Sequence, residues 1–202
     1  MLSALQNLRY SEATEKMIEC WLALPRPEGQ VCPKRSDFSS AFINSALSEV
    51  FLSEWESEGV LKIIQVGTKL DHQIGEDLTG KNIFDMTPEP LRDDERVYYR
   101  ALRDMPCAGM MTRSAPNRLG RHFYYRTLQL PLLDPFNKVQ YFVGTGVVLK
   151  AEQLGREAGY GELDDAELVE RHFYDIGAGL PSREFQSAGA PQRVFFHPDQ
   201  KS

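Results

Sequence analysis

The alternation of apolar and polar residues from Val60 to Val66 is the strongest indication of fold class in this chain. Alternation of this kind is typical of a β-strand with one buried face. The run at 49–55 is also rich in residues that favour strands, and Ser57-Glu58-Gly59 has the composition of a tight turn. The two runs therefore predict an antiparallel hairpin that ends at Gly67.

Three more strands are expected after a long helix. Thr87-Pro88 is a helix-start signal, and Pro106 ends the helix. We expect Leu91, Tyr98, Ala101, Leu102 and Met105 on its buried face and residues 92–96 on its solvent face. The strand candidates that follow are 107–113, 122–130 and 139–149. Because consecutive strands usually pair, this order predicts the α+β class, with a five-stranded antiparallel sheet that carries its helices on one face.

Three parts of the chain follow from this order. Residues 1–40 are expected to form an N-terminal flanking helix and an irregular connector, 41–152 the core domain, and 153–202 a C-terminal extension. In the extension a helix is predicted over Leu163–Phe173, followed by a tail rich in Gly, Pro and Ser. Tails of this composition stay mobile unless they dock on a folded surface.

The N-terminal helix is expected to begin after Ser11, which has the chemistry of an N-cap. An apolar stripe runs along it, with Ala13 followed by Met17, Cys20, Trp21 and Leu24. Two interpretations are open: the stripe packs on its own domain, or its last four residues form a homodimer interface and the route by which a signal leaves. The second predicts that Trp21→Asp weakens self-association without unfolding the core.

Charge and hydropathy argue against two kinds of binding partner, nucleic acids and membranes. The net charge is −6 and no window concentrates Lys and Arg, which argues against nucleic-acid binding because that affinity rests on phosphate neutralisation. No apolar run approaches the ~20 residues that span a bilayer, and the N-terminus lacks the basic-then-apolar pattern of a signal peptide. We therefore expect a cytoplasmic protein that does not bind membranes.

The segment Gly75-x4-Gly80-Lys81 differs by one residue from a phosphate-binding loop. Such loops need Ser or Thr next, whose hydroxyl ligates magnesium, and here Asn82 follows. Glu76 and Asp77 would also repel phosphate. We interpret the segment as a turn.

Signals of catalysis and of metal binding are weak. The three cysteines, Cys20, Cys32 and Cys107, are widely spaced, and no CxxC or HExxH pattern occurs. There is no Gly-x-Ser-x-Gly motif, and Gly144-Thr145-Gly146 lies inside a predicted strand, where glycine allows another element to approach closely. We expect no metal site and no enzyme activity.

Several short motifs belong together as a set: Trp21-Leu22, Pro33–Phe38, Val50-Phe51-Leu52, Gly67-Thr68 and Gly75–Lys81, with softer matches at Phe123–Arg126 and Gly177–Pro181. As a set they resemble the PAS superfamily and, more narrowly, the PAS-type family of single-domain proteins common in alphaproteobacteria. The resemblance spans roughly residues 15–150. It implies a PAS-like sheet and a sensory or protein-interaction module whose ligands are mostly unidentified.

Two cofactor chemistries known from the PAS superfamily are tested by residue. Flavin-binding light sensors form a photoadduct with a Cys on a helix after the second strand, and Asp71–Gly75 contains no Cys. Haem-binding sensors use a His on the long helix, and Leu91–Met105 contains no His. Both chemistries are disfavoured, so the cofactor is unknown; His72, on a neighbouring short helix, is the remaining candidate ligand.

A binding module needs a concave, mostly apolar site with a few polar groups. The predicted cavity walls come from the hairpin, the long helix and the later strands: Trp55, Ile64, Tyr98, Leu102, Met110, Tyr125, Phe142 and Gly144. In the alternative interpretation each of these is simply core. The expected function is a sensory or regulatory module that binds a small ligand or an unidentified protein partner and signals through protein contacts. The alternative is a ligand-free adaptor with a PAS-like core.

Overall fold

The structure, a computed structural model, describes residues 3–8, 10–116, 122–149, 168–182 and 194–198. Its helices are α1 (Ser3–Gln6), α2 (Glu12–Ala23), α3 (Thr68–Ile74), α4 (Ile83–Met86) and α5 (Glu89–Asp104), with 3-10 helices η1 (Arg35–Asp37) and η2 (Ser40–Glu49). Its strands are β1 (Val50–Ser57), β2 (Val60–Val66), β3 (Cys107–Pro116), β4 (His122–Leu133), β5 (Val139–Leu149), β6 (Leu168–Asp175) and β7 (Val194–His197).

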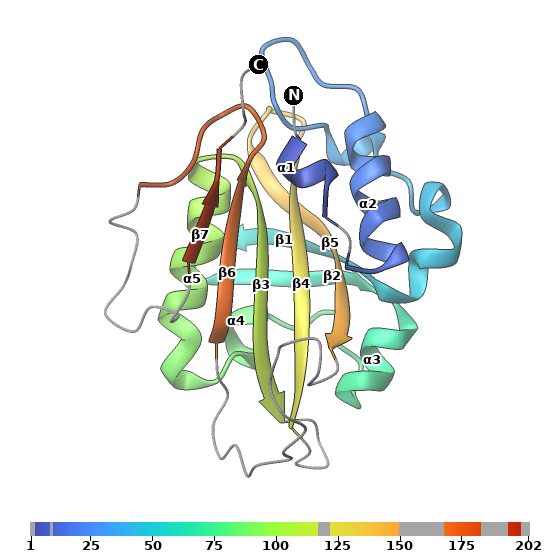
Figure 1. Cartoon of the computed structure of the whole chain (residues 1–202), viewed down its shortest axis with the longest axis vertical. Helices are drawn as coiled ribbons and strands as arrows, with labels where there is room; N and C mark the ends of the chain where they lie inside the picture. Colours follow the sequence, from blue (N-terminus) through green and yellow to red (C-terminus); the bar gives the residue numbers. More distant parts are fainter. Residues whose placement is uncertain (1–2, 9, 117–121, 150–167, 183–193, 199–202) are drawn as a thin grey trace.

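All described strands form one sheet, in the order β2-β1-β5-β4-β3-β6-β7. The predicted hairpin is confirmed, because β1 pairs antiparallel with β2. The first five strands pair antiparallel throughout, as the α+β prediction requires. In Figure 1, β1 and β2 cross behind β3, β4 and β5, so the sheet is strongly twisted. The sheet exceeds the predicted five strands by β6 and β7.

Helices cover both faces of the sheet, and each face has its own apolar core. On one face α2 packs through Met17 and Trp21 against strand residues such as Met110. On the opposite face α5 packs through Tyr98 and Leu102 against the strands. In Figure 1, α1 lies over the upper end of β4, α2 lies to the right beside β5, and α5 lies at the left, partly behind β7. The α+β class is as predicted, but helices lie on both faces of the sheet, because the N-terminal helix α2 covers the face opposite α5.

The start of α2 agrees with its sequence signals. Ser11 accepts a hydrogen bond from the Thr14 backbone N–H at 3.1 Å, and Glu12 and Glu15 lie in the first turn. The start of α5 differs from its prediction. It begins at Glu89, and the hydroxyl of Thr87 is buried, where it donates to the carboxylate of Glu95 instead of capping the helix.

The helix predicted over Leu163–Phe173 is wrong from Leu168 onward, where the chain forms β6; residues 163–167 lie outside the described residues. The free edge of β3 supplies hydrogen-bond partners along the whole length of β6, from Cys107 opposite Asp175 to Arg113 opposite Leu168. This pairing explains the strand, because backbone groups that pair with an existing sheet edge need no helix to satisfy them.

Two histidines meet where β6 pairs in parallel with β7. His172 Nδ1 lies 3.0 Å from His197 Nε2, and the two rings stack at 5.3 Å, with Phe195 stacked on His172 at 4.6 Å. Burial lowers the pKa of both rings, that of His172 to about 4. Two charged groups flank the pair: Glu170, at 3.7 Å from His172 Nε2, favours a protonated ring, and Arg126, which binds Glu170, opposes it.

We expect acid to loosen the pairing of β7. Because the pKa values of His172 and His197 in the folded state lie below the ordinary value, the undocked state binds more protons between pH 6.5 and about 4. The stability of docking is therefore present above pH 6.5 and is lost as pH falls, with the opening constant rising up to about tenfold per pH unit for each proton taken up.

Hydrogen exchange of the Val194–His197 amides, corrected for intrinsic rates, measures this opening. In the variant His197→Phe the pH dependence should weaken, because only His172 then takes up a proton on opening, whereas His72→Asn, which alters an exposed histidine on α3, should leave it unchanged. Titration of both His172 and His197 by NMR near pH 6.5 would contradict the prediction.

Candidate functional site

Glycines define both ends of α3, the helix that forms one wall of a cavity in the core. A Cβ on Gly67 would lie 2.3 Å from the Leu47 carbonyl oxygen, so the chain approaches η2 closely only with glycine at this position. Gly75 ends the helix with φ of 86°, a left-handed conformation that glycine adopts readily. The predicted turn is confirmed: Gly80 also has φ of 83°, and Lys81 pairs with Glu76.

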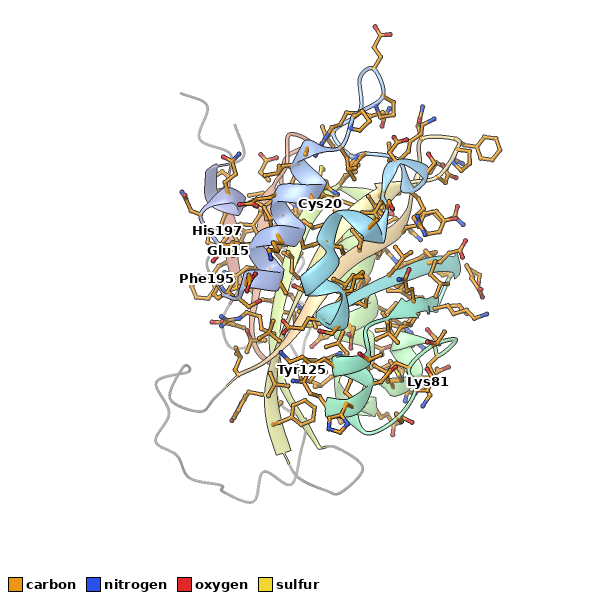
Figure 2. The ribbon with its side chains drawn as sticks, turned by 90° about the vertical axis from the view of Figure 1, so that its right-hand side faces the viewer. Glu15, Cys20, Lys81, Tyr125, Phe195 and His197 are labelled. Carbon is orange, nitrogen blue, oxygen red and sulfur yellow. The ribbon has the colours of Figure 1, made fainter. Side chains whose placement is uncertain are left out.

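The cavity lies on the face of the sheet that α5 covers. On one side are α3 and α4, and on the other are the C-terminal ends of β3 and β5 and the N-terminal part of β4. Its volume is about 210 Å³. A cavity of roughly 150 Å³ holds benzene, and pockets for drug-sized ligands span roughly 300–1,000 Å³. The space therefore suits a molecule somewhat larger than benzene. Figure 2 labels Tyr125, one of the β4 residues that line the cavity.

Most of the wall is apolar, contributed by side chains such as Leu70, Ile74 and Ile83. Close packing brings α3 against β5, because a Cβ on Gly146 would lie 2.8 Å from the Leu70 Cδ2. Glycine at position 146 therefore lets the helix approach the strand and close the cavity on that side.

A buried ion pair forms part of the wall. Arg113 on β3 lines the cavity and donates from Nη1 to the carboxylate of Glu95 on α5, whose side chain is 2% exposed. The Arg113 guanidinium also lies 5.0 Å from the centre of the Tyr125 ring. Burial alone would lower the pKa of Arg113, but the adjacent Glu95 carboxylate raises it above its ordinary value. Burial raises the pKa of Tyr125 to about 12, so its hydroxyl stays protonated at neutral pH.

A second polar network connects the cavity to the core. Gln129, on β4, is fully buried and accepts a hydrogen bond from the Tyr98 hydroxyl at 2.7 Å. Its amide nitrogen donates to Thr127 Oγ1 at 2.6 Å and approaches the Tyr99 hydroxyl at 3.5 Å. Thr127 and Tyr99 line the cavity, so the network supports one wall and satisfies a polar side chain that has no access to water.

Two polar atoms in the cavity wall have no hydrogen-bond partner among the described residues. They are Oε1 of Gln73 on α3 and Nε of Arg113 on β3, both inaccessible to solvent. A buried donor or acceptor without a partner costs free energy, roughly 1–3 kcal/mol.

Of the eight wall residues predicted from the sequence, only Tyr125 lines this cavity. Trp55, Tyr98, Leu102 and Phe142 belong to the core on the same face. The remaining three are in other packing positions: Met110 lies in the core of the opposite face, Ile64 packs against that core, and a Cβ on Gly144 would lie 1.7 Å from the Leu128 carbonyl oxygen. The prediction failed for these residues because strand periodicity does not show which face carries the cavity.

The predicted interface stripe on α2 is mostly buried within its own chain. Met17 and Trp21 are fully buried and Leu24 nearly so, while Cys20 is half-buried. Trp21 donates from Nε1 to the Pro131 carbonyl oxygen at 3.0 Å. The structure therefore corrects the interface interpretation for Met17, Trp21 and Leu24, whose contacts are made inside the chain. Cys20 is labelled on α2 in Figure 2.

Sequence reasoning missed Arg113, Glu95 and Gln73. It placed Glu95, with Asp94, on the solvent face of α5, yet both are buried. The spacing of Leu91, Glu95, Tyr98 and Leu102 is i, i+4, i+7 and i+11, which puts Glu95 on the apolar stripe; this was the available signal. For Arg113 the signal was its position two residues after Met111 on one strand face.

The remaining candidate ligand for a cofactor, His72, is not in the cavity wall. His72 is exposed on α3 and does not line the cavity. In the described part of the chain, no three His, Cys, Asp or Glu side chains are grouped to hold a metal ion. Within the same residues, no helix is long and apolar enough to cross a membrane.

A mostly antiparallel sheet with short helices and one long helix beside a small, partly open cavity is the architecture of the PAS fold. The PAS_5 family model, described as PAS domain, matches residues 9–147. The chain belongs to the PAS domain family, as the sequence motifs predicted. PAS domains are in general sensory modules without catalytic activity.

Similar solved structures include a light-oxygen-voltage domain studied with a flavin analogue, which is 14% identical, with 55% of this chain and 84% of that chain covered and a TM-score of 0.45. The LOV protein of Rhodobacter sphaeroides is 12% identical, with coverages of 55% and 64% and a TM-score of 0.45. The PAS domain of Bordetella pertussis BvgS is 14% identical, with coverages of 57% and 88% and a TM-score of 0.42. No curated protein matches this chain.

Proposed function

We propose that this chain is a cytoplasmic bacterial sensory module, without catalytic activity, that binds a small ligand in the cavity between α3 and β4. The observation that carries the proposal is the cavity itself, with its apolar walls and two buried polar atoms that lack partners. A mostly apolar pocket with a few convergent polar groups is the usual form of a small-molecule site.

Strand β5 offers a route from the cavity to the opposite face. Gly146, Val147 and Val148 line the cavity. The adjacent Thr145 is buried on the other face, where its hydroxyl lies 3.1 Å from that of Thr14 on α2. A ligand that shifts β5 therefore acts on the N-terminal helix through a direct hydrogen bond.

The signal passes from α2 to a protein partner or to a second copy of the chain in this proposal. Because Met17, Trp21 and Leu24 are buried, a homodimer would use the outer side of α2, which carries the half-buried Cys20 and the exposed Glu19. Sedimentation of the wild-type protein and of Glu19→Arg tests this point, since a dimer through the outer side of α2 should dissociate more readily in the variant.

Filling the cavity should abolish ligand binding. Val148 is half-buried in the wall, and Val148→Phe places a ring in the space that a ligand would take. A compound present at about 100 times its Kd stabilises by about 2.7 kcal/mol, which corresponds to roughly 5–10 °C in Tm. In a thermal-shift screen of metabolites, at least one compound should produce such a shift in the wild type and none in Val148→Phe.

The matched control is Val60→Phe, which makes the same change at a half-buried position of β2 outside the cavity and should keep the shift. Equal stabilisation of Val148→Phe would place the ligand elsewhere. A bare polypeptide mass in the native mass spectrum, with no shift from any compound, would overturn ligand sensing and support the ligand-free adaptor instead.

A further inference from the structure

The ion pair of Arg113 and Glu95 has a defined orientation relative to the cavity. Arg113 lines the cavity, whereas its partner Glu95 does not and lies behind it, with its carboxylate accepting hydrogen bonds from Arg113 and from the Thr87 hydroxyl. The positive end of the pair therefore faces the ligand space, and the negative end faces α4 and α5.

The other charged group in the wall does not cancel this orientation. Glu76 lines the cavity next to α3, and its carboxylate is paired with the ammonium group of Lys81. The guanidinium stays charged, because the Glu95 carboxylate raises the pKa of Arg113. The cavity thus presents a fixed cation in a mostly apolar wall.

The cation also has unused hydrogen-bonding capacity. Nε of Arg113 is inaccessible to solvent and has no partner among the described residues. The Tyr125 ring lies against the same guanidinium, at 5.0 Å, and its pKa of about 12 keeps the hydroxyl as a donor at neutral pH. The guanidinium of Arg113, which lines the cavity, and the Tyr125 hydroxyl both suit an acceptor oxygen on the ligand, whereas Nε itself is reached only if the Arg113 side chain moves.

We propose that the ligand is a small monocarboxylic acid with an apolar, ring-sized body, bound with its carboxylate at Arg113. The proposal rests on the proposed function, since it names the ligand class of the same cavity. Hydrogen bonds between a guanidinium and a carboxylate are about twice as strong as those between neutral groups. A cationic ligand would be repelled by Arg113, and a hydrocarbon would offer the guanidinium no acceptor.

The volume of about 210 Å³ sets the size of the apolar body. One aromatic ring or a short branched chain fills the space beside the carboxylate, because a cavity of roughly 150 Å³ already holds benzene. On the α3 side, Gln73 is a polar residue of the same wall.

Calorimetric titration with benzoate, benzamide and toluene tests the ligand class in the wild-type protein. The three probes share the ring and differ in the group offered to Arg113. We expect benzoate to bind at least tenfold more tightly than benzamide, and benzamide more tightly than toluene. Equal affinities, or tighter binding of benzamide or toluene, would overturn the carboxylate proposal and leave ligand sensing standing. Failure of all three probes to bind would overturn it as well, and the metabolite screen then decides ligand sensing separately.

Variants assign the preference to Arg113. In the double variant Glu95→Leu with Arg113→Met, which removes both charges together, benzoate affinity should fall to that of toluene, while toluene still binds. The control is Arg126→Met, which alters a half-buried arginine of β4 that pairs with Glu170 and does not line the cavity. It should keep the tenfold preference. Benzoate affinity unchanged by the loss of Arg113 would overturn the proposal.

Discussion

Trp21→Asp is expected to unfold the domain. The side chain of Trp21 is fully buried in the core between α2 and the sheet, its indole N–H donates to Pro131, and Arg26 lies 4.5 Å from its ring. Truncating a buried Trp typically costs about 3–5 kcal/mol, and burying an unpaired carboxylate adds to that loss. A domain of this size has about 5–15 kcal/mol of stability, so most of it would be lost.

Urea unfolding followed by fluorescence and circular dichroism measures the effect. The matched control is Cys20→Asp, which places the same charge on the preceding residue of α2, where the side chain is half-buried. Its midpoint should fall far less. A folded Trp21→Asp protein with an unchanged midpoint and weakened self-association would restore the interface interpretation of this stripe.

Glu95→Ala should destabilise the protein by about 3–5 kcal/mol, because it leaves Arg113 buried without its partner. The variant also removes the acceptor of the Thr87 hydroxyl. The loss is larger than that of a surface ion pair, which is typically worth about 0–1 kcal/mol. The pair Arg96–Asp93, on the exposed side of α5, provides that comparison through Asp93→Ala.

A double-mutant cycle separates the pair from its surroundings. Replacing both charges, in Glu95→Leu with Arg113→Met, should restore much of the stability lost in Glu95→Ala, since an apolar pair of similar volume avoids an unpaired buried charge. Urea midpoints of Glu95→Leu, of Arg113→Met and of the double variant, compared with the wild type, give the coupling. If the losses of the single variants simply add in the double variant, the buried pair does not interact as the structure indicates.

The sequence predicted the local structure correctly where residues adjacent in the chain determine it. The alternation from Val60 to Val66 predicted a strand, and the turn before it predicted the hairpin that β1 and β2 form. Ser11 predicted the start of α2, and Gly75 a turn. These signals depend on backbone propensity and capping, which act over a few residues.

The candidate site was predicted less well, because a cavity depends on which faces meet. Tyr125 was found, but Arg113 and Glu95 look like ordinary surface charges in sequence. They are buried because β3 and α5 turn these two positions toward each other. Each charge neutralises the other, which lowers the free-energy cost of burying both.

The sequence alone determines that this chain is an α+β protein of the PAS family. It also determines the order of its elements: a hairpin, a long helix and three further strands. The tertiary structure decided three other points: β6 pairs with the free edge of β3, the stripe of α2 covers the second face of the sheet, and the cavity lies beside α3. Periodicity shows that a strand or helix has one buried face. The element that covers this face comes from a chain segment distant in sequence, which periodicity does not identify.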